Sequence, residues 1–396
     1  MDDAVSIDTL AAVAAVALLA AVLVGLLPRL PVPQVVLLLA GGVVLGPGLL
    51  DVGSAADVRV LADVGLGFVF LLAGYEIDLR LFREDAGRRA LASWAVSFGL
   101  AAAVVAVLRA AELVDALLPV ALGLTTTALG TLLPVLREAG LLRGRLGRHL
   151  LATGGVGELL PVLVIAVFLG SQGRAAALLS LLGVALLAVA LVLLRHGIRE
   201  GSRLADVVRA GQHETAQITL RATILLLLVL VAVTDRFHLD AVLGAFLAGL
   251  VLRQWVGTAA PVLESKLDAV GYGFFVPLFF VYSGMGLDLA AIAEAPLRLL
   301  LFLVLMLLVR GGPVLLVYRG VLPRRERWQT ALVSATALPV LVALTEIAVR
   351  SGTMTTEDAA ALVGAGVVTV LVLPALAVVL GRRPVEPAGD PVSPAR

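Results

Sequence analysis

The sequence predicts an all-α, polytopic membrane protein with about thirteen transmembrane helices. Hydrophobic residues make up 60% of the 396 residues and charged residues only 15%, and the mean hydropathy is +1.06. A soluble domain of this composition could not cover its surface with polar groups. Apolar runs of about 20 residues, the length that crosses a bilayer, also follow one another along the chain. The lipid bilayer is therefore the expected surroundings of this fold.

Turn residues and charge clusters divide the chain into the predicted spans. In chain order these are 8–27, 33–50, 57–77, 88–109, 115–137, 147–169, 173–197, 213–234, 238–254, 265–284, 297–319, 327–350 and 357–380. The first span is expected to stay as a membrane helix, because the Met-Asp-Asp start lacks the basic segment of a signal peptide. The proline-rich segment 382–396 is expected to be a disordered tail.

The charges of the loops predict the orientation. One set of loops is rich in arginine: Arg80, Arg83, Arg88, Arg89, Arg137, Arg143, Arg145, Arg148, Arg195, Arg199, Arg203, Arg209, Arg319, Arg324, Arg325, Arg327, Arg382 and Arg383. The alternate loops are acidic: Asp51, Asp57, Glu112, Asp115, Asp235, Asp288, Glu294, Glu357 and Asp358. The positive-inside rule then predicts a multi-pass protein of the plasma or inner membrane, with its N-terminus outside and its C-terminus in the cytoplasm.

Three strings in the second half of the chain resemble strings in the first half. Residues 281–289 match 71–79, 336–339 match 127–130, and 246–250 match 38–42, at offsets of about 208 to 210 residues. An offset of seven spans reverses the membrane orientation, which is the inverted-repeat design of secondary transporters. We therefore predict a first six-helix repeat (1–170), a connecting helix and cytoplasmic loop (171–211) and a second six-helix repeat (212–381). Chance similarity between helices rich in Leu, Ala and Gly is the alternative.

Two spans carry residues that interrupt a helix in the middle of the bilayer. The fifth span contains Thr125, Thr126 and Thr127, followed by Gly130 and Pro134, and the twelfth contains Thr336 and Pro339. We predict two crossed, broken helices whose ends point at mid-membrane, where they can hold a small cation beside a carboxylate. In the alternative interpretation the threonine hydroxyls bond back to carbonyls of a continuous helix.

Glu158 lies in the middle of an apolar span, next to Gly157. An ionisable carboxyl at that depth costs about 2.5 to 3.5 kcal/mol, so a chain that keeps one is expected to use it. It could pair permanently with a buried arginine, act as a catalytic acid, or alternately bind a proton and a cation. The third interpretation is favoured because such a carboxylate can exchange a proton for a cation near neutral pH.

Two further charges accompany Glu158. Arg310 is a cation well inside the eleventh span, and a buried guanidinium needs a partner. It could neutralise Glu158 or Glu346, cap a broken helix end, or extend to the interface. Glu346 could be a deep partner or could pair with Arg350 one turn further along its helix. Asp63, Asp78 and Asp288 lie near predicted helix ends and are expected to be capping or interfacial residues.

Composition also excludes several kinds of function. Cysteine is absent and the four histidines, His149, His196, His213 and His238, have no helical spacing that would form a metal site, so no metal or other cofactor is expected. The net charge of +1 indicates no nucleic-acid partner. An intramembrane enzyme is not expected, because no nucleophile with a base and no metal cluster can be recognised.

Five stretches together resemble the monovalent cation:proton antiporter family, in particular its Kef-like and Nap-like branch. They are residues 38–50, 70–79, 125–130, 275–284 and 334–339. The resemblance implies a panel of helices for homodimer contacts and a core in which two broken helices cross beside an acidic pair. Gly157 and Glu158 stand where the family usually has Asp-Asp or Asn-Asp, and Arg310 stands where it has a Lys or Arg.

The expected function is exchange of Na⁺ or K⁺ for H⁺ by alternating access, electroneutral, without a cofactor. Glu158, Thr126, Thr127 and Gly157 are the expected ion site, with Arg310 or Glu346 as charge partner. The alternatives are an organic-anion or metabolite symporter of similar fold and a membrane sensor that does not transport.

Overall fold

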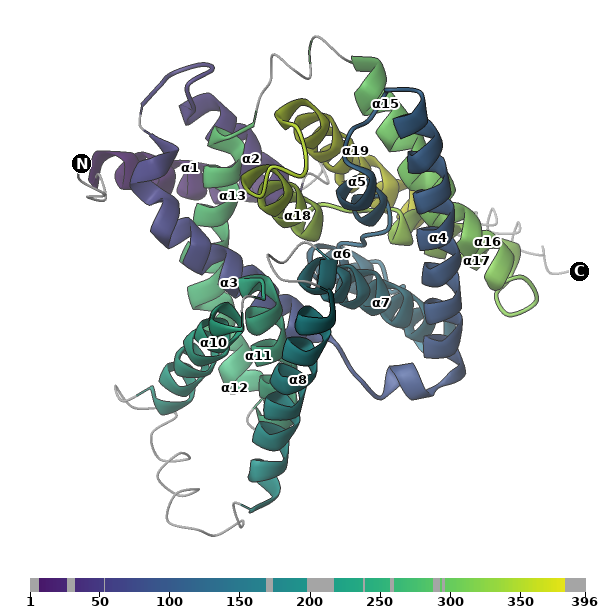
Figure 1. The fold of residues 1–396 in the computed structure, drawn as a ribbon, viewed down its shortest axis with the longest axis horizontal. Helices are drawn as coiled ribbons and strands as arrows, with labels where there is room; N and C mark the ends of the chain where they lie inside the picture. Colours follow the sequence, from purple (N-terminus) through teal and green to yellow (C-terminus); the bar gives the residue numbers. More distant parts are fainter. Residues whose placement is uncertain are drawn as a thin grey trace, which may run out of the picture.

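The computed structural model describes residues 7–26, 33–52, 54–168, 174–197, 217–237, 239–256, 260–287, 293 and 296–381. All regular structure within these ranges is helical, and the helices form two groups (Figure 1). The predicted tail, Asp288, Glu294, His213, His238 and the loop predicted after residue 197 lie outside the described residues.

The first group, which we call the panel bundle, occupies the left and lower parts of Figure 1. Its elements are α1 (Ile7–Leu26), α2 (Gln34–Leu45), η1 (Ala55–Val58), α3 (Arg59–Glu76), α8 (Arg174–Gly197), α10 (Ile218–Arg236), α11 (Ala241–Val256), α12 (Ala260–Val270), the π-helical turn η4 (Gly271–Phe275) and α13 (Val276–Met285). Helix α3 packs on both α11 and α13, and α2 packs on α13. The panel bundle is therefore held together around α3 and α13.

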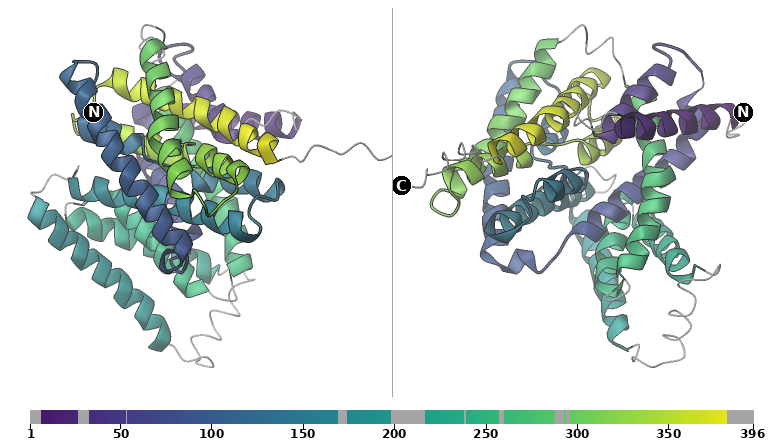
Figure 2. Two further views of the ribbon diagram at one scale, coloured as in Figure 1. Left: turned by 90° about the vertical axis from the view of Figure 1, so that its right-hand side faces the viewer. Right: turned by 180° about the vertical axis from the view of Figure 1, so that it is seen from behind.

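The second group, the core bundle, is built around α7, which packs on α4 and α17. Its elements are η2 (Leu81–Arg83), α4 (Asp85–Ala110), α5 (Leu117–Gly123), α6 (Leu129–Glu138), α7 (Gly144–Phe168), α15 (Pro296–Leu305), the π-helical turn η5 (Met306–Gly311), α16 (Gly312–Val317), α17 (Arg324–Ser334), α18 (Pro339–Arg350) and α19 (Thr356–Gly381). Figure 2 shows the two bundles from the side and from behind.

The helical segments confirm a multi-pass membrane protein. Eight segments of the described residues are long and apolar enough to cross a membrane, and three more apolar helices are shorter. Where the structure describes them, the predicted runs fall on helical segments. The count of thirteen spans and the inverted relation of the two halves stay predictions. Proline within α7 (Pro161) and α19 (Pro374) is tolerated because neighbouring helices in a bundle can satisfy the freed backbone groups.

Both predicted broken helices are broken in the structure. Residues 124–128 separate α5 from α6, and residues 335–338 separate α17 from α18. The two breaks touch, because the Ala128 N–H donates to the Thr336 carbonyl over 2.8 Å. This bond satisfies backbone groups that a break in a membrane helix would otherwise leave without a partner.

On the acidic side of the molecule, an ion cluster joins the two bundles. Arg350 of α18 donates to Asp63 of α3 and to the Tyr282 hydroxyl of α13, each over 3.1 Å, and to Glu346 over 2.6 Å. A cavity of about 240 Å³, lined in part by Ala55, Tyr282, Glu346 and Arg350, lies there. The bundles are thus connected on this side through charged side chains.

Glycine allows α3 and α11 to pack closely within the panel bundle. A Cβ on Gly74 of α3 would clash with the Phe246 carbonyl, and one on Gly249 of α11 would clash with the Leu71 carbonyl. The two helix backbones therefore touch, as small residues allow in membrane helices.

Replacing Gly249 with Leu should reduce folded protein, because overpacking against rigid backbone costs about 1 to 3 kcal/mol or more. Thermal stability and the monodisperse fraction in detergent measure the effect. Gly99→Ala is the matched control: no atom lies within 4 Å of a Cβ at that position, and Ala favours a helix over Gly by up to about 1 kcal/mol. Equal stability of the two variants would contradict the packing described for α3 and α11.

Candidate functional site

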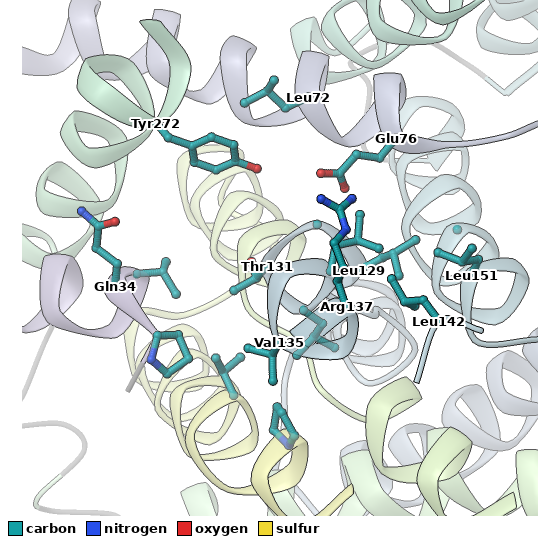
Figure 3. Close-up of a pocket in the computed structure, with 18 of the residues that line it drawn as sticks. Gln34, Leu72, Glu76, Leu129, Thr131, Val135, Arg137, Leu142, Leu151 and Tyr272 are labelled. Atoms are coloured by element: carbon teal, nitrogen blue, oxygen red, sulfur yellow. The ribbon is translucent and has the colours of Figure 1, made fainter. Parts of the chain in front are cut away.

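A large cavity of about 1320 Å³ lies between the panel bundle and the core bundle. Asp78 and Leu81 of the loop after α3, and Ala139 and Leu142 of the segment after α6, help to line it. These segments neighbour Arg80, Arg83 and Arg143 in the sequence, so the cavity belongs to the arginine-rich side. It reaches Leu129, Gly130 and Gly155 in the interior, and Figure 3 shows its lining.

Glu158 lies beside the inner end of this cavity. It is only 2% exposed, and its Oε1 accepts a hydrogen bond of 3.2 Å from the Gly130 backbone N–H. Gly130 is the second residue of α6, so the carboxylate meets the positive end of that helix dipole. The other oxygen, Oε2, is buried without a hydrogen-bond partner among the described groups. The broken helix therefore stabilises the carboxylate and leaves one oxygen for a ligand.

Glu76 of α3 is a second carboxylate at this place, and the sequence analysis missed it. A Cβ built on Gly130 would lie 2.7 Å from the Glu76 Oε2, which also has no described hydrogen-bond partner. Glu76 and Glu158 therefore flank Gly130, one from each bundle. Glu76 is the last residue of α3, so its place in the sequence resembles that of an ordinary interfacial residue. Two features of the sequence could have indicated Glu76. It lies in the stretch 70–79 that resembles the antiporter family, and residues 71–79 match residues 281–289.

The predicted threonines lie at the break but differ in their bonds. The hydroxyl of Thr125 donates to the Leu122 carbonyl and that of Thr126 to the Gly123 carbonyl. The alternative interpretation expects these bonds, but the continuous helix that it assumes is broken here. The Thr127 hydroxyl instead donates to the Ser334 carbonyl of α17 over 2.7 Å. Thr127 thus joins the two broken helices.

Arg310 also binds this crossing. Its side chain is 0% exposed. Nε donates to the Thr127 hydroxyl over 3.1 Å and Nη2 to the Thr153 carbonyl of α7 over 3.0 Å. No ion pair with Glu158 or Glu346 occurs among the described residues. Arg310 sits in η5, and such π-helical turns often mark functional sites.

Gly157 is the residue that makes room for this arrangement. A Cβ at position 157 would lie 2.6 Å from the Arg310 Nη2 and would also clash with the Thr127 hydroxyl. The Gly157 carbonyl accepts the Thr127 backbone N–H over 3.1 Å. An acidic side chain at this position would therefore have to displace Arg310 or Thr127.

The remaining predicted residues have structural positions. The Thr336 carbonyl receives the bond from Ala128, Pro339 is the first residue of α18, and Pro134 lies within α6. Glu346 pairs with Arg350 on the acidic side, as one of its two interpretations expects. Within the described residues, no group of three His, Asp or Glu side chains could hold a metal ion.

Comparison with known proteins gives the family. The sodium/hydrogen exchanger family model, which describes the transmembrane region, matches residues 14–380. The chain is 29% identical over 327 residues to the glutathione-regulated potassium-efflux system protein KefC of Salmonella paratyphi B, covering 79% of this chain. It is 28% identical over 286 residues to the Na⁺/H⁺ antiporter NhaS5 of Synechocystis, covering 66% of this chain. It spans 51% of KefC and 37% of NhaS5.

A solved structure supports the fold. The sodium proton antiporter MjNhaP1 from Methanocaldococcus jannaschii matches with a TM-score of 0.61 and 18% sequence identity, over 93% of this chain and 94% of that chain. The match of the family model over nearly all the helices, together with this shared fold, leads to one conclusion: the chain belongs to the sodium/hydrogen exchanger family of cation/proton antiporters.

Proposed function

We propose that this protein exchanges a monovalent cation, Na⁺ or K⁺, for a proton by alternating access, and that Glu158 and Glu76 together bind the cation. The observation that carries this proposal is the pair of carboxylates on either side of Gly130, at the end of a broken helix. Each has a buried oxygen without a described hydrogen-bond partner. A partly dehydrated monovalent cation between them would supply the missing charge.

The charge of the site supports a one-for-one exchange. Two carboxylates close together in a poorly solvated place resist being ionised together, so the empty pair keeps one proton. A single monovalent cation replaces that proton without changing the net charge. Arg310 does not change it either, because a guanidinium keeps its proton. We therefore propose an electroneutral cycle.

The two sides of the molecule support alternating access. The large cavity reaches Gly130 from the arginine-rich side, while Arg350 joins the bundles on the opposite side. With the arginine-rich side assigned to the cytoplasm, this is an inward-facing state in a plasma or inner membrane. Movement of one bundle against the other, in a homodimer held by panel helices, would open the other side.

The organic-anion alternative fits the site less well than a cation does. Four carboxylates (Glu76, Asp78, Glu264 and Asp268) line the cavity against two arginines, Arg137 and Arg253. This excess of acidic groups disfavours an organic anion as the transported solute. A sensor without transport would keep the same carboxylates but would carry no flux. No residue of the site suggests enzymatic chemistry, and we propose that transport needs no cofactor.

Glu158→Gln should abolish cation-dependent proton flux, because an amide neither releases a proton nor balances a cation. Proteoliposomes containing a pH dye, with pulses of Na⁺, K⁺ and Li⁺, measure the flux. Glu357→Gln, at an exposed position of α19, is the control with the same chemical change and should transport normally. Normal flux in the Glu158 variant would sink the proposed mechanism, and a wild-type protein without flux would favour the sensor.

Glu76→Gln should weaken the apparent cation affinity by about tenfold or more, since loss of a charged contact costs about 1.5 to 3 kcal/mol. Asp78→Asn is its control in the same cavity, because the Asp78 carboxylate already accepts the Arg80 backbone N–H over 2.9 Å. The comparison uses initial rates against cation concentration. Equal affinities for both variants would remove Glu76 from the site.

Cation concentration jumps on a solid-supported membrane test the stoichiometry. The proposed cycle moves no net charge, so a pH change inside the vesicles should occur without a sustained current. A current that grows with the rate of the pH change would show unequal numbers of protons and cations, and both carboxylates would then release protons.

A further inference from the structure

Arg137 is a basic residue of the large cavity whose position the mechanism above does not explain. The cavity has two basic lining residues, Arg137 and Arg253, beside its four carboxylates. Arg253 is engaged: its Nη1 lies 4.0 Å from the Glu264 carboxylate, and its guanidinium lies 5.4 Å from the centre of the Tyr75 ring. Arg137 is exposed and forms no ion pair within 4.0 Å among the described residues.

The helix geometry directs Arg137 toward the carboxylate pair. Arg137 follows Gly130 by seven residues on α6, which is two turns, so the two residues share a face. Side chains on a helix lean toward its N-terminus, and Gly130 lies in that direction. In Figure 3 the guanidinium of Arg137 is directed at the Glu76 carboxylate across the cavity. A tethered positive charge thus faces one of the two groups that the transported cation would use.

We propose that Arg137 is an intramolecular competitor of the transported cation, and that it sets the apparent affinity on the cytoplasmic side. This inference rests on the function proposed above. When the cation is absent, the guanidinium of Arg137 partly balances the charge of Glu76. When the cation binds, this favourable electrostatic interaction is weakened. Removing the guanidinium should therefore tighten cation binding, whereas an essential ligand would weaken it when removed.

The competition should depend on the conformation. Arg137 belongs to the core bundle and Glu76 to the panel bundle, so relative movement of the bundles changes the distance between their charges. The effect is therefore expected for cations that arrive through the large cavity, and not for cations that arrive from the opposite side. A change in the overall charge of the protein would not be confined to one side, so a difference between the two sides indicates a local competitor.

The test compares Arg137→Gln, Arg137→Lys and Arg143→Gln in everted membrane vesicles. Arg143 is exposed just before α7 and does not line the cavity. Arg143→Gln is therefore the control, because it removes the same charge from the same side of the protein. Arg137→Gln should lower the apparent KM for the cation about two- to fivefold, the range expected for an exposed charge pair. The maximal rate, normalised to protein, should not change.

The other two variants should keep a KM near that of the wild type, because Lys retains the charge and Arg143 lies elsewhere. High ionic strength from impermeant choline chloride should reduce the difference in apparent KM between Arg137→Gln and the wild type, because salt screens the charge of Arg137. An unchanged or higher KM for Arg137→Gln, or an equal decrease for Arg143→Gln, would overturn the inference. Absence of flux in wild-type vesicles would instead overturn the proposed function. If Arg137→Gln yields less folded protein in detergent, Arg137→Met, which also removes the charge, should show the same decrease in KM.

Discussion

The structure depends on keeping the Glu158 carboxylate buried within a bundle of apolar helices. Glu158 is stabilised there by the start of α6, through the bond from the Gly130 N–H. That helix start is available inside the bundle because the chain breaks between α5 and α6. The second broken helix meets this break through the bond from Ala128 to Thr336. The proposed ion site therefore depends on the crossing, where a backbone group of one broken helix bonds to a backbone group of the other.

Arg310 and Gly157 together explain how a buried guanidinium fits beside α7. The guanidinium approaches the backbone of α7 over the bare Gly157 and binds Thr127 and the Thr153 carbonyl. The positive charge therefore holds the crossing together instead of pairing with an adjacent acidic side chain. Glu76 comes from the panel bundle and Glu158 from the core bundle, so the two carboxylates beside Gly130 span the boundary between the bundles. A cation bound between them, as we propose, would couple occupancy to the relative position of the bundles.

Several of these features could be predicted from the sequence. Composition predicts the membrane protein, and residues that weaken helices predict the two breaks. A lone carboxyl inside an apolar run predicts that Glu158 is buried, as it is; its role in transport stays a prediction. Glu76 could not be recognised as a candidate ligand from the sequence, because a carboxyl at the end of an apolar run resembles an interfacial residue. Its position becomes clear only when the loop after α3 is seen to line the large cavity. The partners of Arg310 could not be predicted either, since they come from segments more than 150 residues away. Glu346 stayed ambiguous until its pairing with Arg350 placed it on the acidic side.

The central claim is that one cation replaces one proton shared by Glu158 and Glu76. Isothermal titration calorimetry of the purified protein in detergent tests it directly, with cation binding measured in several buffers that differ in ionisation enthalpy. The slope of the binding enthalpy against that buffer enthalpy counts the protons released. The account predicts about one proton per bound cation near neutral pH, from two carboxylates that cannot both ionise. Release of no proton, or of two, would contradict it.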